Sequence, residues 1–188
     1  MNKYNELRKI LTNRNLDAYI VPKNDEFFGE YAFPNRLKTI SNFSGSAGFA
    51  IICRSSNYLF VDGRYLIQSK MESGKYFKIF EIPYKYPKDV LRIDKIKHIG
   101  YDPNLFTNSI LQRYFGNKFQ LISIKENLID YIHVEKKVKK NLFFNLNNKI
   151  AGESVASKIN RFYKKIKKEK LDNIFVSAPE NVGWLLNI

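Results

Sequence analysis

The chain has 188 residues, enough for one sizeable core or for one domain and part of a second. Its content of 44% hydrophobic and 15% aromatic residues excludes an intrinsically disordered protein. The single cysteine, Cys53, excludes an internal disulfide and a metal site built from several thiolates. The sequence shows neither an apolar run of the roughly 20 residues that span a membrane nor a signal-peptide pattern, so we expect a cytoplasmic protein.

The formal net charge is +14, and lysine supplies most of it. Two basic runs stand out, residues 135–140 and residues 163–170. The second run falls on a predicted amphipathic helix, so its lysines are expected to form the solvent-exposed face. A nucleic-acid partner is the weaker interpretation because no zinc-finger, base-stacking or RNA-binding aromatic motif accompanies the charge.

The N-terminal part alternates between helical and strand patterns. The spacing of Tyr4, Leu7 and Leu11 predicts an amphipathic helix over residues 2–15. A short strand over residues 16–21 follows, and the acidic, aromatic segment after it has no periodicity and is predicted as a loop. A helix followed at once by an apolar strand is typical of a layered α/β fold.

Residues 36–69 carry most of the functional signal. A polar turn that contains Gly45 and Gly48 leads into two short apolar runs, residues 49–53 and 58–61. The glycines permit backbone angles or close approaches that a Cβ would forbid. The two runs, separated by turn residues, predict a hairpin of buried strands.

The second of these strands ends in Asp62-Gly63-Arg64. Asp62 is a suitable N-cap for a helix over residues 64–73. Arg64 then lies at a helix start beyond a strand end, where its side chain can project. The alternative is a solvated surface arginine, because Asp-Gly is a common turn.

Five more elements are expected before residue 130. They are strand 76–82, helix 90–96, strand 98–101, a helix through Phe115 and strand 119–124. Thr107 is a good N-cap for the fourth of these, and Gly116 is a typical end for it. The last three form a βαβ unit, which favours a parallel pair of strands.

A change of composition near residue 130 predicts a domain boundary. A basic run and an asparagine-rich segment lie there, so we assign residues 1–130 to a first domain, 131–150 to a linker and 151–188 to a second domain. A helix is expected to begin near Ser154. Its apolar residues fall on one face.

The second domain repeats the start of the first. Residues 171–176 (LDNIFV) echo residues 16–21 (LDAYIV), and each follows a basic amphipathic helix, so both are predicted as strands. The chain ends on the apolar run 184–188. We therefore expect a truncated second copy, from an artificially shortened chain, a gene fragment or a frameshifted gene.

Six segments, in this order, resemble the N-terminal region of long-form aminopeptidase P, the Xaa-Pro aminopeptidases. They are LDAYIVP (16–22), the stretch 36–69 with its SGSAG and DGR motifs, IGYDP (99–103), KENLID (125–130), AGES (151–154) and VGWLLNI (182–188). The resemblance implies an α/β fold: a three-layer creatinase N-terminal (RNase H-like) domain with a mixed central sheet flanked by helices, followed by the start of a second copy.

The resemblance also implies a function. The family removes an N-terminal residue that precedes proline, using two divalent metal ions, usually manganese, held by a catalytic domain. No residue of this chain matches those metal ligands or a catalytic residue, so the chain alone is predicted to be inactive. Arg64 matches an arginine that contacts the peptide substrate. The implied partners are the protein's own catalytic domain, a peptide with proline at its second position and a second copy in a homodimer, with no membrane partner.

The remaining polar residues receive structural interpretations. His98 and His133, the only histidines, are expected to be structural or surface residues. Asp25, Glu26 and Glu30 form an acidic group that is a weak candidate for a metal site. Two alternative functions stay open: a stand-alone α/β interaction module or orphan gene fragment, and a basic nucleic-acid-binding domain.

Overall fold

The structure, a computed structural model, describes residues 3–29, 31–92, 95–133 and 142–188. The chain divides into two units, residues 1–136 and residues 137–188. Each unit is described by itself below.

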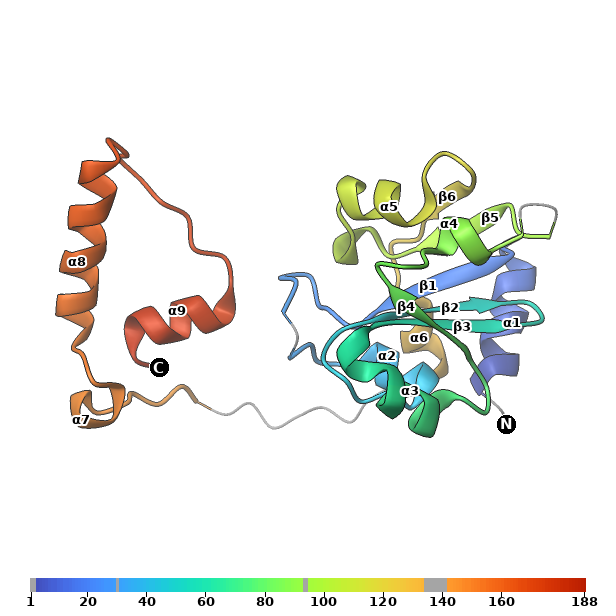
Figure 1. Cartoon of the computed structure of the whole chain (residues 1–188), viewed down its shortest axis with the longest axis horizontal. Helices are drawn as coiled ribbons and strands as arrows, with labels where there is room; N and C mark the ends of the chain where they lie inside the picture. Colours follow the sequence, from blue (N-terminus) through green and yellow to red (C-terminus); the bar gives the residue numbers. More distant parts are fainter. Residues whose placement is uncertain (1–2, 30, 93–94, 134–141) are drawn as a thin grey trace. The chain divides into compact units, whose positions relative to one another are not determined.

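A six-stranded sheet forms the centre of the first unit, with strand order β4-β3-β2-β1-β5-β6 (Figure 1). The strands are β1 (Ala18–Pro22), β2 (Phe49–Cys53), β3 (Asn57–Asp62), β4 (Lys78–Ile82), β5 (His98–Tyr101) and β6 (Gln120–Ser123). β2 is antiparallel to both of its neighbours, and every other pair is parallel. The carboxyl ends of the five other strands therefore lie along one edge, here called the carboxyl edge.

Helices cover both faces of this sheet and give three layers (Figure 1). One face carries α1 (Lys3–Asn13), α2 (Arg36–Ser41), α3 (Leu66–Ser73) and α6 (Leu128–Ile132), and the other carries α4 (Pro87–Val90) and α5 (Asn108–Phe115). The predicted fold class, a mixed central sheet flanked by helices, is confirmed.

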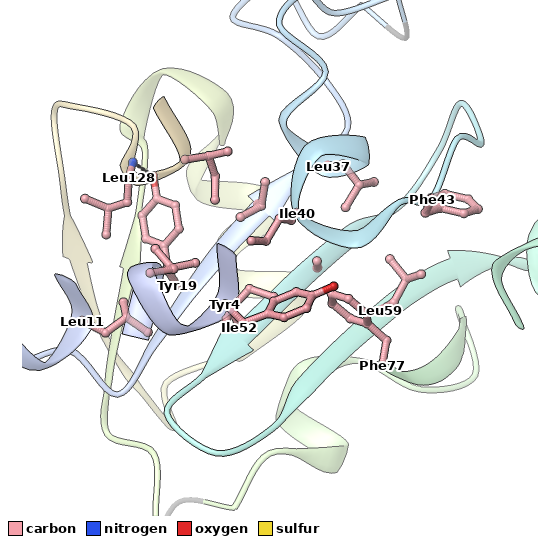
Figure 2. Packing of buried hydrophobic residues seen from close by; sticks show 14 of the residues in the cluster. Tyr4, Leu11, Tyr19, Leu37, Ile40, Phe43, Ile52, Leu59, Phe77 and Leu128 are labelled. Atoms are coloured by element: carbon pink, nitrogen blue, oxygen red, sulfur yellow. Dashed lines mark hydrogen bonds between the residues drawn. The ribbon is translucent and has the colours of Figure 1, made fainter. Parts of the chain in front are cut away.

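The two central strands, β1 and β2, are buried along their whole length. Because successive strand residues face opposite sides, Tyr19 and Ile52 enter the core under α1, α2 and α6, and Ile20 and Ile51 enter the core under α5. Figure 2 shows the first of these cores, where the Tyr19 hydroxyl accepts a hydrogen bond from the Leu128 N–H at 3.3 Å. Burial raises the pKa of Tyr19 above its ordinary value. The hydrogen bond between Leu128 and Tyr19 ties α6 to the sheet.

The hairpin and the βαβ unit are as predicted. β2 and β3 pair antiparallel. β5 and β6 pair parallel, and α5 connects them in the sequence. Thr107 Oγ1 accepts a hydrogen bond from the Ile110 N–H at 3.2 Å, and Gly116 ends α5. The predicted amphipathic helix at the N-terminus is α1, with Tyr4, Leu7 and Leu11 buried.

The helix predicted over residues 90–96 is wrong. α4 begins at Pro87 and ends at Val90, because proline suits a first helical position and the Asp89 side chain accepts a hydrogen bond from the N–H of Tyr86 at 2.8 Å. Leu91 has extended backbone angles and packs in the core. Residues 93–94 lie outside the described part of the chain.

The second unit consists of helices and loops in its described part, residues 142–188. Its helices are α7 (Asn148–Ala151), α8 (Val155–Lys168) and α9 (Pro179–Leu186). The predicted helix start is confirmed, since Ser154 caps α8. Buried Lys158 donates hydrogen bonds at 2.6 Å to the carbonyl of Trp184 and to Oδ1 of Asn187, and its Nζ lies 4.3 Å from the centre of the Trp184 ring.

The strand predicted over residues 171–176 is wrong, because that segment has no regular secondary structure. A strand needs a neighbour for its N–H and C=O groups, and residues 142–188 contain no strand that could pair with it. The predicted linker, 131–150, overlaps the end of α6, and its central residues 134–141 lie outside the described residues. The domain division drawn from the sequence stays a prediction.

The Cys53 thiol is a site of low expected reactivity. The residue is 3% exposed at the end of β2, and burial raises the pKa of the thiol to about 12. We therefore expect the native chain at pH 8 to react with a disulfide reagent only when it is unfolded by urea. Because the folded pKa is raised, this group's contribution to stability is complete below the ordinary thiol pKa and is lost as the pH rises toward 12. Rapid labelling of the native chain would contradict this expectation.

Candidate functional site

The Asp62-Gly63-Arg64 corner lies at the carboxyl edge, where β3 ends. Asp62 Oδ1 accepts a hydrogen bond from the Arg64 N–H at 3.0 Å and so caps a 3₁₀ turn, η1 (Gly63–Tyr65). This turn leads directly into α3. The predicted cap is confirmed, with a 3₁₀ turn in place of the first helical turn.

The same carboxylate orients the Arg64 guanidinium. Arg64 Nε donates to Asp62 Oδ1 at 3.1 Å, and Nη2 donates to Oδ2 at 2.8 Å. This hydrogen bond from Arg64 lowers the pKa of Asp62 below its ordinary value. The Arg64 side chain is 71% exposed. The fork thus sets the direction of a guanidinium that is largely open to solvent.

The glycine-containing turn that precedes β2 is bound to this corner. Ser46 Oγ and Tyr65 OH lie 2.8 Å apart and share a hydrogen bond. Glu72 accepts hydrogen bonds at 2.7 Å from both the N–H and the Oγ of Ser44. Burial opposes ionisation of Glu72, but these bonds from Ser44 outweigh it and lower the pKa of the carboxyl. A Cβ at Gly45 would overlap the ring of Phe43, so the turn fits closely against its surroundings.

Residues of this turn also line an apolar pocket of about 240 Å³ at the carboxyl edge. The larger apolar side chains around it are Pro22, Phe28, Phe49, Ile82, Phe106, Ile110 and Tyr114. Phe49 and Tyr114 stack with their ring centres 4.3 Å apart. The turn therefore joins two surfaces, a charged corner at Arg64 and an aromatic pocket.

One member of the acidic group singled out in the sequence, Asp25, has a structural role. Asp25 Oδ1 accepts hydrogen bonds from the N–H groups of Phe27 at 3.0 Å and Gly29 at 2.8 Å, as expected of a turn cap. Glu30 lies outside the described residues. The described part of the chain contains no group of three or more His, Cys, Asp or Glu that could hold a metal ion. The described Asp25 and Glu26 do not fit the metal pair, which the family resemblance assigns to the catalytic domain.

The two histidines fit their structural interpretations. His98 lies in β5, and its Nδ1 is 3.6 Å from Asp17 Oδ2. Burial acts to raise the pKa of Asp17, but the hydrogen bonds that its carboxylate accepts from the N–H groups of His98 and Lys97 outweigh this effect. The pKa of Asp17 is therefore below its ordinary value. His133 follows the last residue of α6.

In the described residues, no helix is both long and apolar enough to cross a membrane.

A second, polar pocket of about 600 Å³ was not found from the sequence. It is called the β5–β6 pocket, and its lining residues are Glu26, Arg36, Asp102, Asn104, Leu105, Lys125, Glu126, Asn127, Asp130 and Tyr131. Arg36 donates two hydrogen bonds of 2.8 Å to Asp130, which join α2 to α6. Two segments singled out in the sequence contribute to the lining: IGYDP holds Asp102, and KENLID holds Lys125, Glu126, Asn127 and Asp130. These two segments are far apart in the sequence.

The fold and the corner define the first unit as a three-layer α/β domain with polar side chains gathered at the carboxyl edge of an open sheet. The chain belongs to the creatinase/prolidase N-terminal domain family, whose model matches residues 3–131. A second model of the same description matches residues 134–188.

Relatives with curated names cover nearly the whole chain. A probable Xaa-Pro aminopeptidase P from Laccaria bicolor is 32% identical over 97% of the chain, and aminopeptidase P1 from Lotus japonicus is 31% identical over 100%. In both cases the match covers 30% of the relative, so the chain spans about a third or less of the length of these proteins. It matches the N-terminal region of Xaa-Pro aminopeptidases.

Solved structures agree on the fold. The X-prolyl aminopeptidase from Caenorhabditis elegans, a cytosolic enzyme with a di-nuclear active site, aligns with a TM-score of 0.70 at 24% identity and covers 98% of this chain and 34% of its own. The Xaa-Pro aminopeptidase from Streptococcus thermophilus aligns with a TM-score of 0.53 at 21% identity, over 69% of this chain and 94% of its own.

Proposed function

We propose that this chain is the non-catalytic N-terminal portion of an Xaa-Pro aminopeptidase, which releases an N-terminal residue that precedes proline. The proposal is supported by the match to the N-terminal third of such enzymes. In it, the two divalent metal ions, manganese, are held by a catalytic domain outside this chain. The partners are that domain, a peptide with proline at its second position and a second copy of the protein, in the cytoplasm. Residues 1–130 and 151–188 are the first domain and the start of the second, joined by the linker 131–150.

Within this function, Arg64 contacts the peptide substrate. The observation that carries this assignment is the fork from Asp62, which holds an exposed guanidinium at the carboxyl edge of the sheet. Ligands bind at this edge in open α/β sheets. A guanidinium held in this way can donate paired hydrogen bonds to a peptide carbonyl or carboxylate. The role of Asp62 is to position Arg64, and the bonds of Ser46 and Glu72 support the turn beside it.

The test uses a full-length relative, such as the Laccaria bicolor enzyme, with the arginine that aligns with Arg64 changed to alanine. We expect kcat/KM for proline-containing peptides to fall about tenfold or more, because a charge-assisted hydrogen bond contributes about 1.5–3 kcal/mol. Most of the loss should appear in KM if the contact is made equally in the ground state. Replacement by lysine should restore only part of the loss, because lysine cannot form the planar fork.

The matched control is an alanine at the position that aligns with Arg54. In this chain Arg54 lies at the other end of the hairpin and bonds Asp17 and the Leu16 carbonyl. That variant should keep its kcat/KM. Equal kinetics of the Arg64 variant and the wild type, with unchanged thermal stability, would remove the substrate contact from the proposal.

A further inference from the structure

The β5–β6 pocket lies where the strand order of the sheet reverses. From β1 the chain turns to β2, β3 and β4 on one side, and it then returns to β5 and β6 on the other side. In open α/β sheets, ligands bind outside the carboxyl ends of the strands at such a switch point. The pocket is lined by Glu26 after β1, by Asp102, Asn104 and Leu105 after β5 and by residues 125–127 after β6. Asn24 bridges the switch point by donating a hydrogen bond to the Leu105 carbonyl at 3.1 Å.

A buried carboxylate lines this pocket. Asp102 is 5% exposed, and its two oxygens accept hydrogen bonds of 3.0 Å from the Asn104 N–H and from Nδ2 of Asn127. It forms no ion pair with any residue in the described part of the chain. Each carboxylate oxygen can accept a further hydrogen bond. Buried charges in proteins are usually paired, and the described cation whose charge acts on Asp102 is Arg36, which is shared with Asp130.

The other charges of the pocket indicate what else the partner carries. Arg36 donates two hydrogen bonds to Asp130, and its charge also acts on Asp102. One cation therefore serves two carboxylates, which leaves an excess negative charge that an ammonium group can meet. Lys125 is the other basic residue of the lining, it is exposed, and it makes no ion pair with a described residue. The exposed Glu26 adds negative charge at the rim, whereas the exposed Glu126 lies 4.0 Å from Arg14 in an ion pair. A ligand with both an ammonium group and a carboxylate complements this arrangement.

We propose that the β5–β6 pocket binds a free amino acid or short peptide in its zwitterionic form, with the ammonium group at Asp102 and the carboxylate at Lys125. Its volume of about 600 Å³ lies within the range of small-molecule sites. The Asn127 amide bonds Asp102, and Arg36 bonds Asp130, so these lining side chains are held in place without ligand. This site does not depend on the role proposed for Arg64.

The test is a titration of the ¹⁵N-labelled chain with glycylglycine, followed by the backbone amide signals of the pocket residues. We expect saturable shifts at Asn104, Leu105 and Asn127. Glycinamide, which lacks the carboxylate, should bind several-fold more weakly, and N-acetylglycine, which lacks the ammonium group, should cause no saturable shift. Absence of saturable shifts with glycylglycine, or equal shifts with N-acetylglycine, would overturn the proposal.

Two variants test the assigned contacts. Asp102→Asn should weaken glycylglycine binding about tenfold or more, because it removes the charge that the ammonium group meets. Asn104→Lys leaves the backbone bond to Asp102 in place and brings a tethered ammonium group to the pocket, so it should compete with the ligand and weaken binding to a similar extent. Lys85→Gln, a change at an exposed lysine outside the pocket lining, is the control and should bind as the wild type does.

If Asp102→Asn fails to fold, Asn104→Lys decides the matter alone. Wild-type affinity in a folded Asn104→Lys variant would show that the peptide does not occupy the space next to Asp102, and the proposal would be wrong.

Discussion

Replacing Phe60 by alanine is expected to lower the free energy of unfolding of the first unit by about 3–5 kcal/mol, the usual cost of deleting a fully buried aromatic ring. Phe60 is 0% exposed in β3. Its ring stacks on Phe49 with centres 4.8 Å apart and on Phe80 with centres 5.5 Å apart. Rings that belong to strands on both sides cannot collapse into the space that alanine leaves. Since a domain is stable by only about 5–15 kcal/mol, this loss is a large share of the total.

The measurement is urea unfolding followed by far-ultraviolet circular dichroism. Tryptophan fluorescence is unsuitable because the single tryptophan, Trp184, lies in the second unit. The midpoint should fall while the slope of the transition stays near that of the wild type. Phe27→Ala is the matched control, because Phe27 is 59% exposed in the same unit and should tolerate the change within about 0.5 kcal/mol. Similar midpoints for the two variants would contradict the role of this stack.

The elements that could be predicted from the sequence are those whose signals are local. Thr107 and Gly116 mark the start and the end of α5, and the apolar runs of the hairpin mark β2 and β3. The signal for each of these elements therefore lies within or next to the element itself. The prediction over 171–176 failed because apolar residues create a strand only when another strand pairs with them. Similarly, α2 was missed because a six-residue helix shows too few turns for a periodic pattern.

The candidate sites differ in the same way. The Arg64 corner could be predicted because its cap and its arginine are neighbours in the sequence. The β5–β6 pocket could not, because its buried carboxylate and its charged walls come from segments as far apart as Arg36 and Asp130. Only the strand order brings them to one edge, and the order of strands in a sheet is not written in any single stretch of sequence.

Gly48→Ala is expected to lower the free energy of unfolding of the first unit by about 2–6 kcal/mol. Gly48 has φ +148, a backbone conformation that costs a residue with a Cβ about 1–3 kcal/mol. An added Cβ would also lie 2.8 Å from the carbonyl oxygen of Phe60 and 3.2 Å from Cγ1 of Val61. Both neighbours belong to β3, which is hydrogen-bonded on both sides and cannot move away. Overpacking of this kind adds about 1–3 kcal/mol when it is not relieved.

Gly116→Ala separates the two causes. Gly116 also has a positive φ, +57, but an added Cβ there would meet nothing within 4 Å. That variant should lose only the backbone term, about 1–3 kcal/mol, because Gly116 has φ +57 and ψ −143. Urea midpoints of the two variants, compared with the wild type, give the contribution of the close approach to Phe60 by difference. Because Gly48 ends the turn that Ser46 and Tyr65 hold beside Arg64, a larger loss at Gly48 would mean that the sheet itself positions the corner. Equal losses at both glycines would mean that the turn is adjustable, and the fixed geometry argued for Arg64 would then rest on Asp62 alone.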